Sequence, residues 1–329
     1  MFAADALLMQ QVLGPSGAAQ RRAVAKAITL LESTRADHRA RADDLLNALL
    51  PATGRSFRLG ISGVPGVGKS TFIEALGLFL IARGHRVAVL AVDPSSSVSG
   101  GSILGDKTRM DRLSMDERAY IRPSPASGNL GGVAEKTREA LLVCEAAGFD
   151  VVIVETVGVG QSETAVAGMT DLFVLLQLPN AGDDLQAIKK GVMEIADLVV
   201  INKADLDEAA ATRARAQITS ALRWFGPHGH GSAQVLQLSA LKGSGLDDFW
   251  QAVTASREAQ VRSGRLTERR HAQDEAWMWE RIESGLRLQF HQRAAVRAAL
   301  PQITAEVRAG RLAASVAARR LLDLSALAN

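Results

Sequence analysis

Residues 60–71, GISGVPGVGKST, carry the clearest chemistry in this sequence. They contain the pattern G-x-x-x-x-G-K-[ST], in which Gly63, Gly68, Lys69 and Ser70 hold the fixed positions. Glycines let backbone N–H groups turn towards phosphates, a lysine at this position neutralises the β- and γ-phosphates, and the serine hydroxyl ligates Mg²⁺. The segment therefore predicts a loop that binds a nucleoside triphosphate. The expected contacts are Gly63, Val64, Pro65, Gly66, Val67, Gly68, Lys69, Ser70 and Thr71.

A second motif indicates which base is bound. VVINKADL contains N-K-x-D, with Asn202, Lys203 and Asp205, and the aspartate carboxylate can accept from the N1 and N2 groups that guanine offers and adenine does not. An ordinary turn at a strand end would also fit these four residues. LSALKGSG follows the next predicted strand, however, and is similar to the second guanine-contacting loop of G proteins. Its expected contacts are Ser239, Ala240 and Leu241.

Three acidic residues are candidates for the metal side of the site. Asp93 ends a predicted strand, Asp106 lies in the Ser/Gly-rich loop that follows, and Glu155 begins ETVG where most G proteins have D-x-x-G. Carboxylates suit Mg²⁺ or its water shell. Gly158 would supply a backbone N–H for the γ-phosphate. The alternatives are a turn cap before Pro94 for Asp93, a solvated charge for Asp106 and a tolerated Asp-to-Glu change for Glu155.

The elements that must position these residues follow from the apolar pattern. Short β-branched runs alternate with helical stretches between residues 56 and 256, which predicts an α/β P-loop GTPase fold with a mostly parallel sheet flanked by helices. Residues 1–55 and 257–329 have helical spacing and are expected to form N-terminal and C-terminal helical extensions, with Pro301 at a helix break. The expected strands are 57–62, 86–93, 150–155, 171–178, 197–203 and 233–239.

The amino-acid composition indicates which partners and which location to expect for this protein. The 329 residues are 47% hydrophobic, so a large core is possible, and a net charge of +3 with 4% aromatic residues gives no reason to expect a nucleic-acid partner. Cys144 is the one cysteine and fits a buried position on a helix. No apolar run reaches the roughly 18 residues that cross a bilayer, and no signal peptide is recognisable. We expect a cytoplasmic protein without a membrane partner.

Several segments resemble one family, the methylmalonyl-CoA mutase-associated GTPases of the MeaB/MMAA type, formerly labelled ArgK or LAO/AO transport kinases. They are GVPGVGKST, VDPSSSVSGGSILGDKTRM, ETVGVGQSE, QLPNAGDDLQAIKKGVMEIADL and NKAD. The resemblance covers nearly the whole chain. It implies a GTPase of the SIMIBI class that acts as a chaperone of a cobalamin-dependent acyl-CoA mutase, with GTP/GDP and Mg²⁺ as cofactors.

The resemblance also implies roles for individual residues. Lys69, Asp93 and Glu155 would be catalytic, and Ser70, Asp93, Asp106 and Glu155 would surround the metal. Gln161 belongs to a mobile switch, so we expect slow intrinsic hydrolysis that a partner accelerates. Trp277 or Trp279 would meet a second subunit in a homodimer formed through the C-terminal arm. The charged candidates for a switch that contacts the mutase are Asp183, Asp184, Lys189 and Lys190.

Three other functions remain to be weighed. A metal-insertion GTPase for hydrogenase or urease predicts a Cys/His cluster, whereas this chain has one cysteine, and His228 and His230 lack further ligands nearby in the sequence. A P-loop kinase predicts ATP, which NKAD disfavours. A structural adaptor with a degenerate site is disfavoured by the intact motif residues. The sequence does not indicate which acyl-CoA mutase is the partner.

Overall fold

A computed structural model of the chain describes residues 2–33, 35–92, 110–123, 130–156, 162–179, 190–224 and 233–326. The chain divides into two compact units, Met1–Leu266 and Thr267–Asn329. The first unit holds the sheet and the predicted nucleotide motifs. Each unit is described here by itself.

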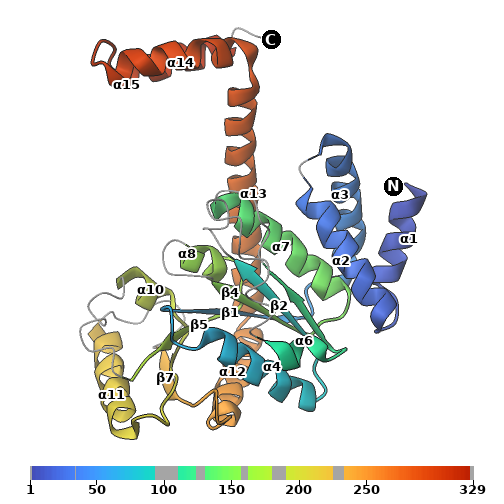
Figure 1. Cartoon of the computed structure of the whole chain (residues 1–329), viewed down its shortest axis with the longest axis vertical. Coiled ribbons are helices and arrows are strands. Elements are labelled where there is room, and N and C mark those ends of the chain that lie inside the picture. The colour runs from blue at the N-terminus through green and yellow to red at the C-terminus, as the bar shows by residue number, and fades with distance from the viewer. Residues whose placement is uncertain are drawn as a thin grey trace. The chain divides into compact units, whose positions relative to one another are not determined.

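The first unit is built on a seven-stranded parallel sheet with the strand order β3-β2-β4-β1-β5-β6-β7. The α/β prediction is confirmed, and all six predicted strands are present. β3 was not predicted, and it forms one edge of the sheet (Figure 1). The strands are β1 (Phe57–Gly63), β2 (Val87–Val92), β3 (Ala119–Arg122), β4 (Val151–Thr156), β5 (Leu172–Gln177), β6 (Leu198–Ile201) and β7 (Gln234–Gln237).

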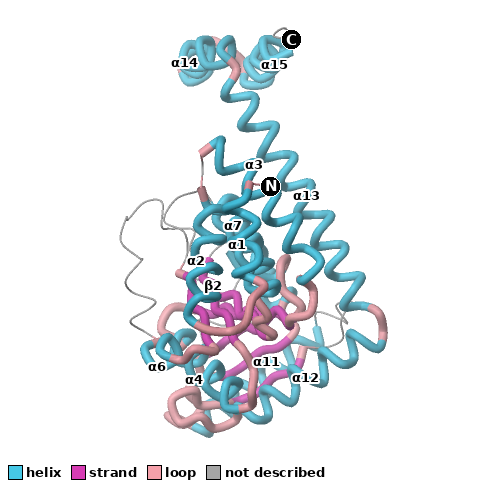
Figure 2. Tube along the Cα trace, turned by 90° about the vertical axis from the view of Figure 1, so that its right-hand side faces the viewer, coloured by secondary structure: helices cyan, strands magenta, loops and turns pink. Residues whose placement is uncertain are grey.

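Helices cover both faces of this sheet, as the near-continuous apolar strands require. Figure 1 shows α7 and α8 above the sheet and α4, α6 and α12 below it. Figure 2 shows the strands as one layer between these helices. Around the sheet the helices are α4 (Lys69–Ala82), α6 (Asp111–Met115), α7 (Leu130–Ala146), α8 (Ser162–Ala167), α10 (Lys190–Ile195), α11 (Glu208–Trp224) and α12 (Leu246–Arg262).

The N-terminal helices α1 (Ala3–Val12), α2 (Ala18–Glu32) and α3 (Ala36–Leu49) pack on the face that α7 covers. Val24, Ile28 and Leu31 of α2 are almost fully buried there. The Gln20 side chain fastens the start of α2, because its amide N–H group donates to the Ala147 carbonyl at 2.9 Å. α2 is thus fixed to the sheet and its covering helix α7 by apolar burial and by a buried amide.

The second unit contains most of α13 (Arg265–Gln292), together with α14 (Ala294–Arg308) and α15 (Ala314–Ala326). The helical C-terminal extension is confirmed, but the break expected at Pro301 is wrong. Pro301 lies inside α14, and the chain instead breaks at Arg293, an extended residue before α14. In the described ranges, no helix is both long and apolar enough to cross a membrane.

A buried ion pair links β1 to α7. The guanidinium of Arg58 donates twice to the Glu145 carboxylate, at 2.8 and 3.0 Å, and the Ser56 hydroxyl and the Gly54 N–H donate to the same carboxylate. Burial would raise the pKa of Glu145, but these hydrogen bonds, with that of Arg58 the largest, lower it on balance. Glu145 therefore stays ionised at neutral pH although its side chain is 1% exposed.

Replacing Glu145 with alanine should lower the free energy of unfolding by about 3–5 kcal/mol, because the Arg58 charge is then buried without its partner. Urea denaturation at pH 7 measures the change. Because folding lowers the Glu145 pKa, its contribution is complete above the ordinary carboxyl pKa. That contribution disappears as the pH falls through the lowered value, so the difference from wild type should shrink in acid.

Glu258→Ala is the matched control, since Glu258 pairs with Arg262 at 3.6 Å on the exposed side of α12. Exposed pairs of this kind contribute about 0–1 kcal/mol. Equal losses for the two variants would contradict the structural role assigned to Glu145.

Candidate functional site

The phosphate loop connects the end of β1 to the start of α4. Gly66 and Gly68 have φ values of 80° and 92°, a region that side chains with a Cβ rarely occupy. A Cβ on Gly68 would also lie 2.8 Å from Nδ2 of Asn202, so the close approach requires glycine. The Lys69 ammonium donates to the Gly63 carbonyl at 2.6 Å. The predicted loop residues therefore form one turn around the N-terminus of α4, where backbone N–H groups favour an anion.

Asn202 holds the phosphate loop to the base-reading loops. Its Nδ2 donates to the Val67 carbonyl at 2.8 Å, and its Oδ1 accepts from the Ala240 N–H at 3.1 Å. Asn202 is 1% exposed, so both hydrogen bonds are shielded from water. One amide thus fixes three predicted segments: the phosphate loop, the end of β6 and the loop after β7.

Lys203 adds a second connection to the phosphate loop. Its ammonium donates to the Gly66 carbonyl at 2.8 Å. Its φ of 61° is the one positive value found for a residue other than glycine across the described ranges. Strained backbone of this kind persists where the surroundings hold it, often at functional sites.

Asp205 is placed to accept hydrogen bonds from a base. A hydrogen bond from Ser239 lowers the pKa of Asp205, and the nearby charge of Lys242 lowers it further. The Lys242 ammonium lies 3.6 Å from Oδ2 of Asp205. The carboxylate is therefore ionised and oriented by the loop that also carries Ala240 and Leu241, the arrangement predicted for guanine.

Glu155 lies beside the phosphate loop rather than on the opposite face of the sheet. It is 3% exposed and is in register with Ile61 of β1. Because strand side chains alternate, Glu155 shares a face with Ile61 and Ile153, the face that α4 covers. A buried carboxylate at the carboxyl end of a parallel strand is where ligands of such sheets bind.

Two oxygen-bearing side chains in the described part of the chain, those of Ser70 and Glu155, are suited to bind a magnesium ion. Ser70 lies in the first turn of α4, and Glu155 is on the sheet face that this helix covers. A hydroxyl and a carboxylate are hard oxygen ligands of the type that Mg²⁺ prefers. Ser70 and Glu155 would hold the ion or its water shell, and the ion would supply positive charge to the phosphates.

Other predicted site residues lie outside the described part of the chain. Asp93 and Asp106 of the metal side are among them, as is Gly158. The same is true of Asp183, Asp184 and Lys189 of the predicted partner switch, while Lys190 is described only as the first residue of α10.

Two residues near the base site were not predicted. Lys242 forms the ion pair with Asp205, and Leu206 directly follows Asp205 with 75% of its surface exposed. Leu241, in the loop after β7, is 82% exposed. Exposed leucines next to a base-reading carboxylate are suited to cover an aromatic base. The signal in the sequence was the apolar residue that follows NKAD, which the pattern N-K-x-D does not include.

Asn202→Ala should weaken GDP binding about 10- to 100-fold, because two buried hydrogen bonds that shape the site are lost. Titration calorimetry of the purified protein with GDP and Mg²⁺ measures the affinity. Asn47→Ala, on the exposed face of α3, is the matched control and should bind GDP as the wild type does. Unchanged affinity in Asn202→Ala would contradict the bridging role.

Comparison with known proteins agrees with this geometry. Residues 24–295 match the family described as "Methylmalonyl Co-A mutase-associated GTPase MeaB". A putative GTPase of Caulobacter vibrioides is 55% identical over 306 residues, which cover 93% of this chain and 94% of that relative.

The mitochondrial methylmalonic aciduria type A homolog of Mus musculus is 45% identical over 315 residues, covering 92% of this chain and 76% of that protein. The crystal structure of a LAO/AO transport system kinase superposes with a TM-score of 0.77 at 38% identity and covers 98% of both chains. The predicted resemblance is confirmed: the chain belongs to the MeaB family of methylmalonyl Co-A mutase-associated GTPases, and it is a GTP-hydrolysing enzyme.

Proposed function

We propose that this GTPase is a chaperone of a cobalamin-dependent acyl-CoA mutase. It would gate the loading of the cofactor into the mutase, and it would protect or reactivate the mutase. The observation that carries the proposal is the match of residues 24–295 to a family described by its association with methylmalonyl Co-A mutase. The relationship to a methylmalonic aciduria type A homolog supports the same partner class.

In this proposal the described residues bind and orient the nucleotide. The Lys69 ammonium would exchange the Gly63 carbonyl for phosphate oxygens, since it already lies in the phosphate loop. Asp205, held by Ser239 and Lys242, would accept the N1 and N2 protons of guanine. Ser70, Glu155, Asp93 and Asp106 would hold Mg²⁺ or its water shell, and the ion would supply positive charge beside the phosphates.

The nucleotide would act as a timer. Bound γ-phosphate orders switch segments in GTPases, and hydrolysis releases them. Gly158 would meet the γ-phosphate directly after Glu155. The segment with Asp183, Asp184, Lys189 and Lys190 would carry the nucleotide state to the mutase, because it follows β5, which pairs with the phosphate-loop strand β1.

The competing activity is that of a P-loop kinase, because the solved relative is named a LAO/AO transport system kinase. A kinase of this fold would use ATP, whereas the Asn202, Asp205 and Ser239 arrangement favours guanine. The choice of nucleotide therefore separates the two functions.

We expect slow Mg²⁺-dependent hydrolysis of GTP by the purified chain, severalfold faster with the cobalamin-dependent mutase from the same organism. ATP should be hydrolysed far more slowly, since Asp205 finds no matching donors on adenine. Phosphate release, measured with each nucleotide and with and without the mutase, gives these rates. A GTPase unaffected by the mutase would remove the proposed partner, and a preference for ATP would favour the kinase.

Joint replacement of Lys189 and Lys190 by alanine should reduce the stimulation by the mutase while GDP affinity stays close to that of the wild type. The contact surface would be altered, whereas the phosphate loop and Asp205 would not. Lys242→Ala serves as the contrasting variant, because it should weaken nucleotide binding through Asp205. Full stimulation of the double variant would contradict the switch assignment.

The protein is further proposed to form a homodimer through its C-terminal helices. Met278, Ile282 and Leu286 of α13 are 40–60% exposed and recur every four residues, which forms an apolar stripe typical of an interface. Ile282→Asp should therefore shift the protein towards monomer in light scattering, and Ser284→Asp, on the opposite side of α13, should not. A wild-type monomer at high concentration would refute the dimer.

A further inference from the structure

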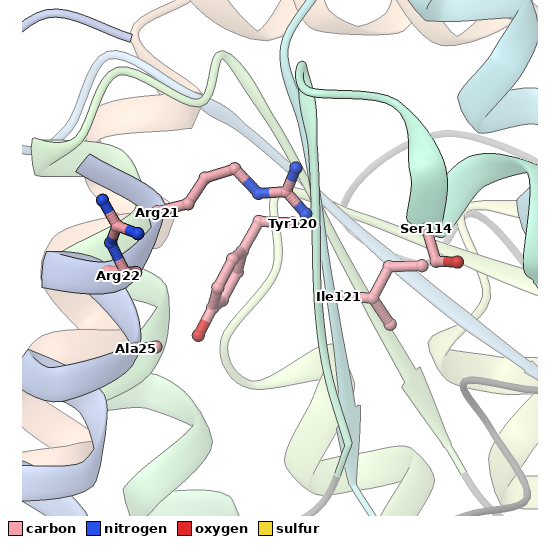
Figure 3. Close-up of a pocket in the computed structure, with 6 residues that line it drawn as sticks. All are labelled: Arg21, Arg22, Ala25, Ser114, Tyr120 and Ile121. Atoms are coloured by element: carbon pink, nitrogen blue, oxygen red, sulfur yellow. The ribbon is translucent and has the colours of Figure 1, made fainter. Parts of the chain in front are cut away.

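A pocket of about 340 Å³ lies at the free edge of the sheet, away from the phosphate loop. Figure 3 shows Tyr120 and Ile121 on opposite sides of strand β3, with Arg21 reaching from α2 towards this strand. Three elements contribute to the walls. The lining residues are Arg21, Arg22 and Ala25 of α2, Ser114 of α6, and Tyr120 and Ile121 of β3.

The α2 wall is fixed at both of its ends. At the first end, the Arg86 guanidinium donates to the Gln20 carboxamide oxygen at 2.8 Å, while Gln20 also donates to the Ala147 carbonyl. At the other end, Glu32, the last residue of α2, forms an ion pair with Arg122, the last residue of β3. Arg21, Arg22 and Ala25 lie between these two attachments, so the helix backbone that carries them is held in place.

The α6 wall is fixed as well. The Glu74 carboxylate of α4 accepts from the Arg112 N–H at 2.8 Å and from the Leu113 N–H at 3.4 Å, which caps the first turn of α6. Gly77 of α4 leaves room for Leu113, since a Cβ there would lie 2.6 Å from the leucine side chain. Ser114 is therefore held in place on the side of the strand opposite Arg21.

The pocket carries positive charge without a matching acid. Within the described ranges, neither Arg21 nor Arg22 makes a side-chain hydrogen bond or an ion pair, and none of the six lining residues is acidic. Burial raises the pKa of Tyr120, so its hydroxyl adds no negative charge. Two adjacent guanidinium groups with free donors are suited to a phosphate or a carboxylate.

We propose that this pocket binds a small organic anion, with its phosphate or carboxylate group at Arg21 and Arg22 of α2 and its apolar body against Tyr120, which lies on the same side of β3 (Figure 3). The volume is in the range of small-molecule sites, and the mixture of apolar walls with a few convergent polar groups is typical of them. A volume of about 340 Å³ favours a compact ligand over an extended peptide.

Tyr120 is the one tyrosine of the sequence, so it gives a specific probe of this pocket. Biosynthetic incorporation of 3-fluorotyrosine would place a single fluorine on the pocket wall. The labelled full chain, saturated with GDP and Mg²⁺ to occupy the phosphate loop, is titrated with phenyl phosphate at constant ionic strength. We expect a saturable ¹⁹F shift in the millimolar range, a smaller response to inorganic phosphate or benzoate, and none to phenol.

Joint replacement of Arg21 and Arg22 by alanine should weaken phenyl phosphate binding about tenfold or more, because both anion donors are lost. The matched control removes the same charge from α11 through Arg213→Ala and Arg215→Ala, and should bind as the wild type does. GDP affinity should be unchanged in both double variants, which verifies folding. An absent or non-saturable shift in the wild type, or an equal affinity in the two double variants, would overturn the proposal.

Discussion

The side-chain amide of Asn202 sets the geometry on which the nucleotide site depends. Its two buried hydrogen bonds, to the Val67 carbonyl and from the Ala240 N–H, connect segments that are far apart in the sequence. An aspartate would repel the Val67 carbonyl, and an apolar residue would leave both backbone groups unpaired in the interior. The phosphate loop and the base-reading loop are therefore held by the same side chain, so a displacement of one loop would shift the other.

The position of Glu155, the described carboxylate of the proposed magnesium site, follows from the pleat of β4. Alternation directs Val154 to one core cluster and Glu155 to the face covered by α4, where the helix that begins at Lys69 also presents Ser70. A carboxylate with one extra methylene reaches further from the same backbone position. In the proposed magnesium site, this extra reach would explain a glutamate where most G proteins have an aspartate, because the sheet fixes the position of the backbone.

Much of the fold could be predicted because β1, β2, β4, β5 and β6 are runs of buried, mostly apolar residues. β3 could not, since its four residues, Ala119–Arg122, directly follow the charged segment 116–118 and include a single β-branched residue, Ile121. Pro301 was predicted to end a helix, but the surrounding apolar periodicity continues through it. Local patterns predict local structure well, whereas an edge strand depends on its neighbour β2.

The site residues also divide into those that a local sequence pattern predicts and those that depend on neighbours in space. The fixed motif residues were predicted because phosphate and guanine each demand particular groups at particular spacings. Lys242 and Leu206 were not, because they contribute through position beside Asp205 and not through a fixed pattern. The edge pocket has no sequence signature at all, since α2, α6 and β3 each supply only a few of its residues.

The attachment of α2 through Gln20 has a consequence for synthesis of the chain. The hydrogen bond from Gln20 to the Ala147 carbonyl joins residues 127 positions apart. Domains generally fold as units while the ribosome extends them from the N-terminus, so α2 has to wait for α7 before it can dock. During that interval Val24, Ile28 and Leu31 can pack only against α1 and α3, and the part of their apolar face that α7 covers in the folded protein stays exposed to water.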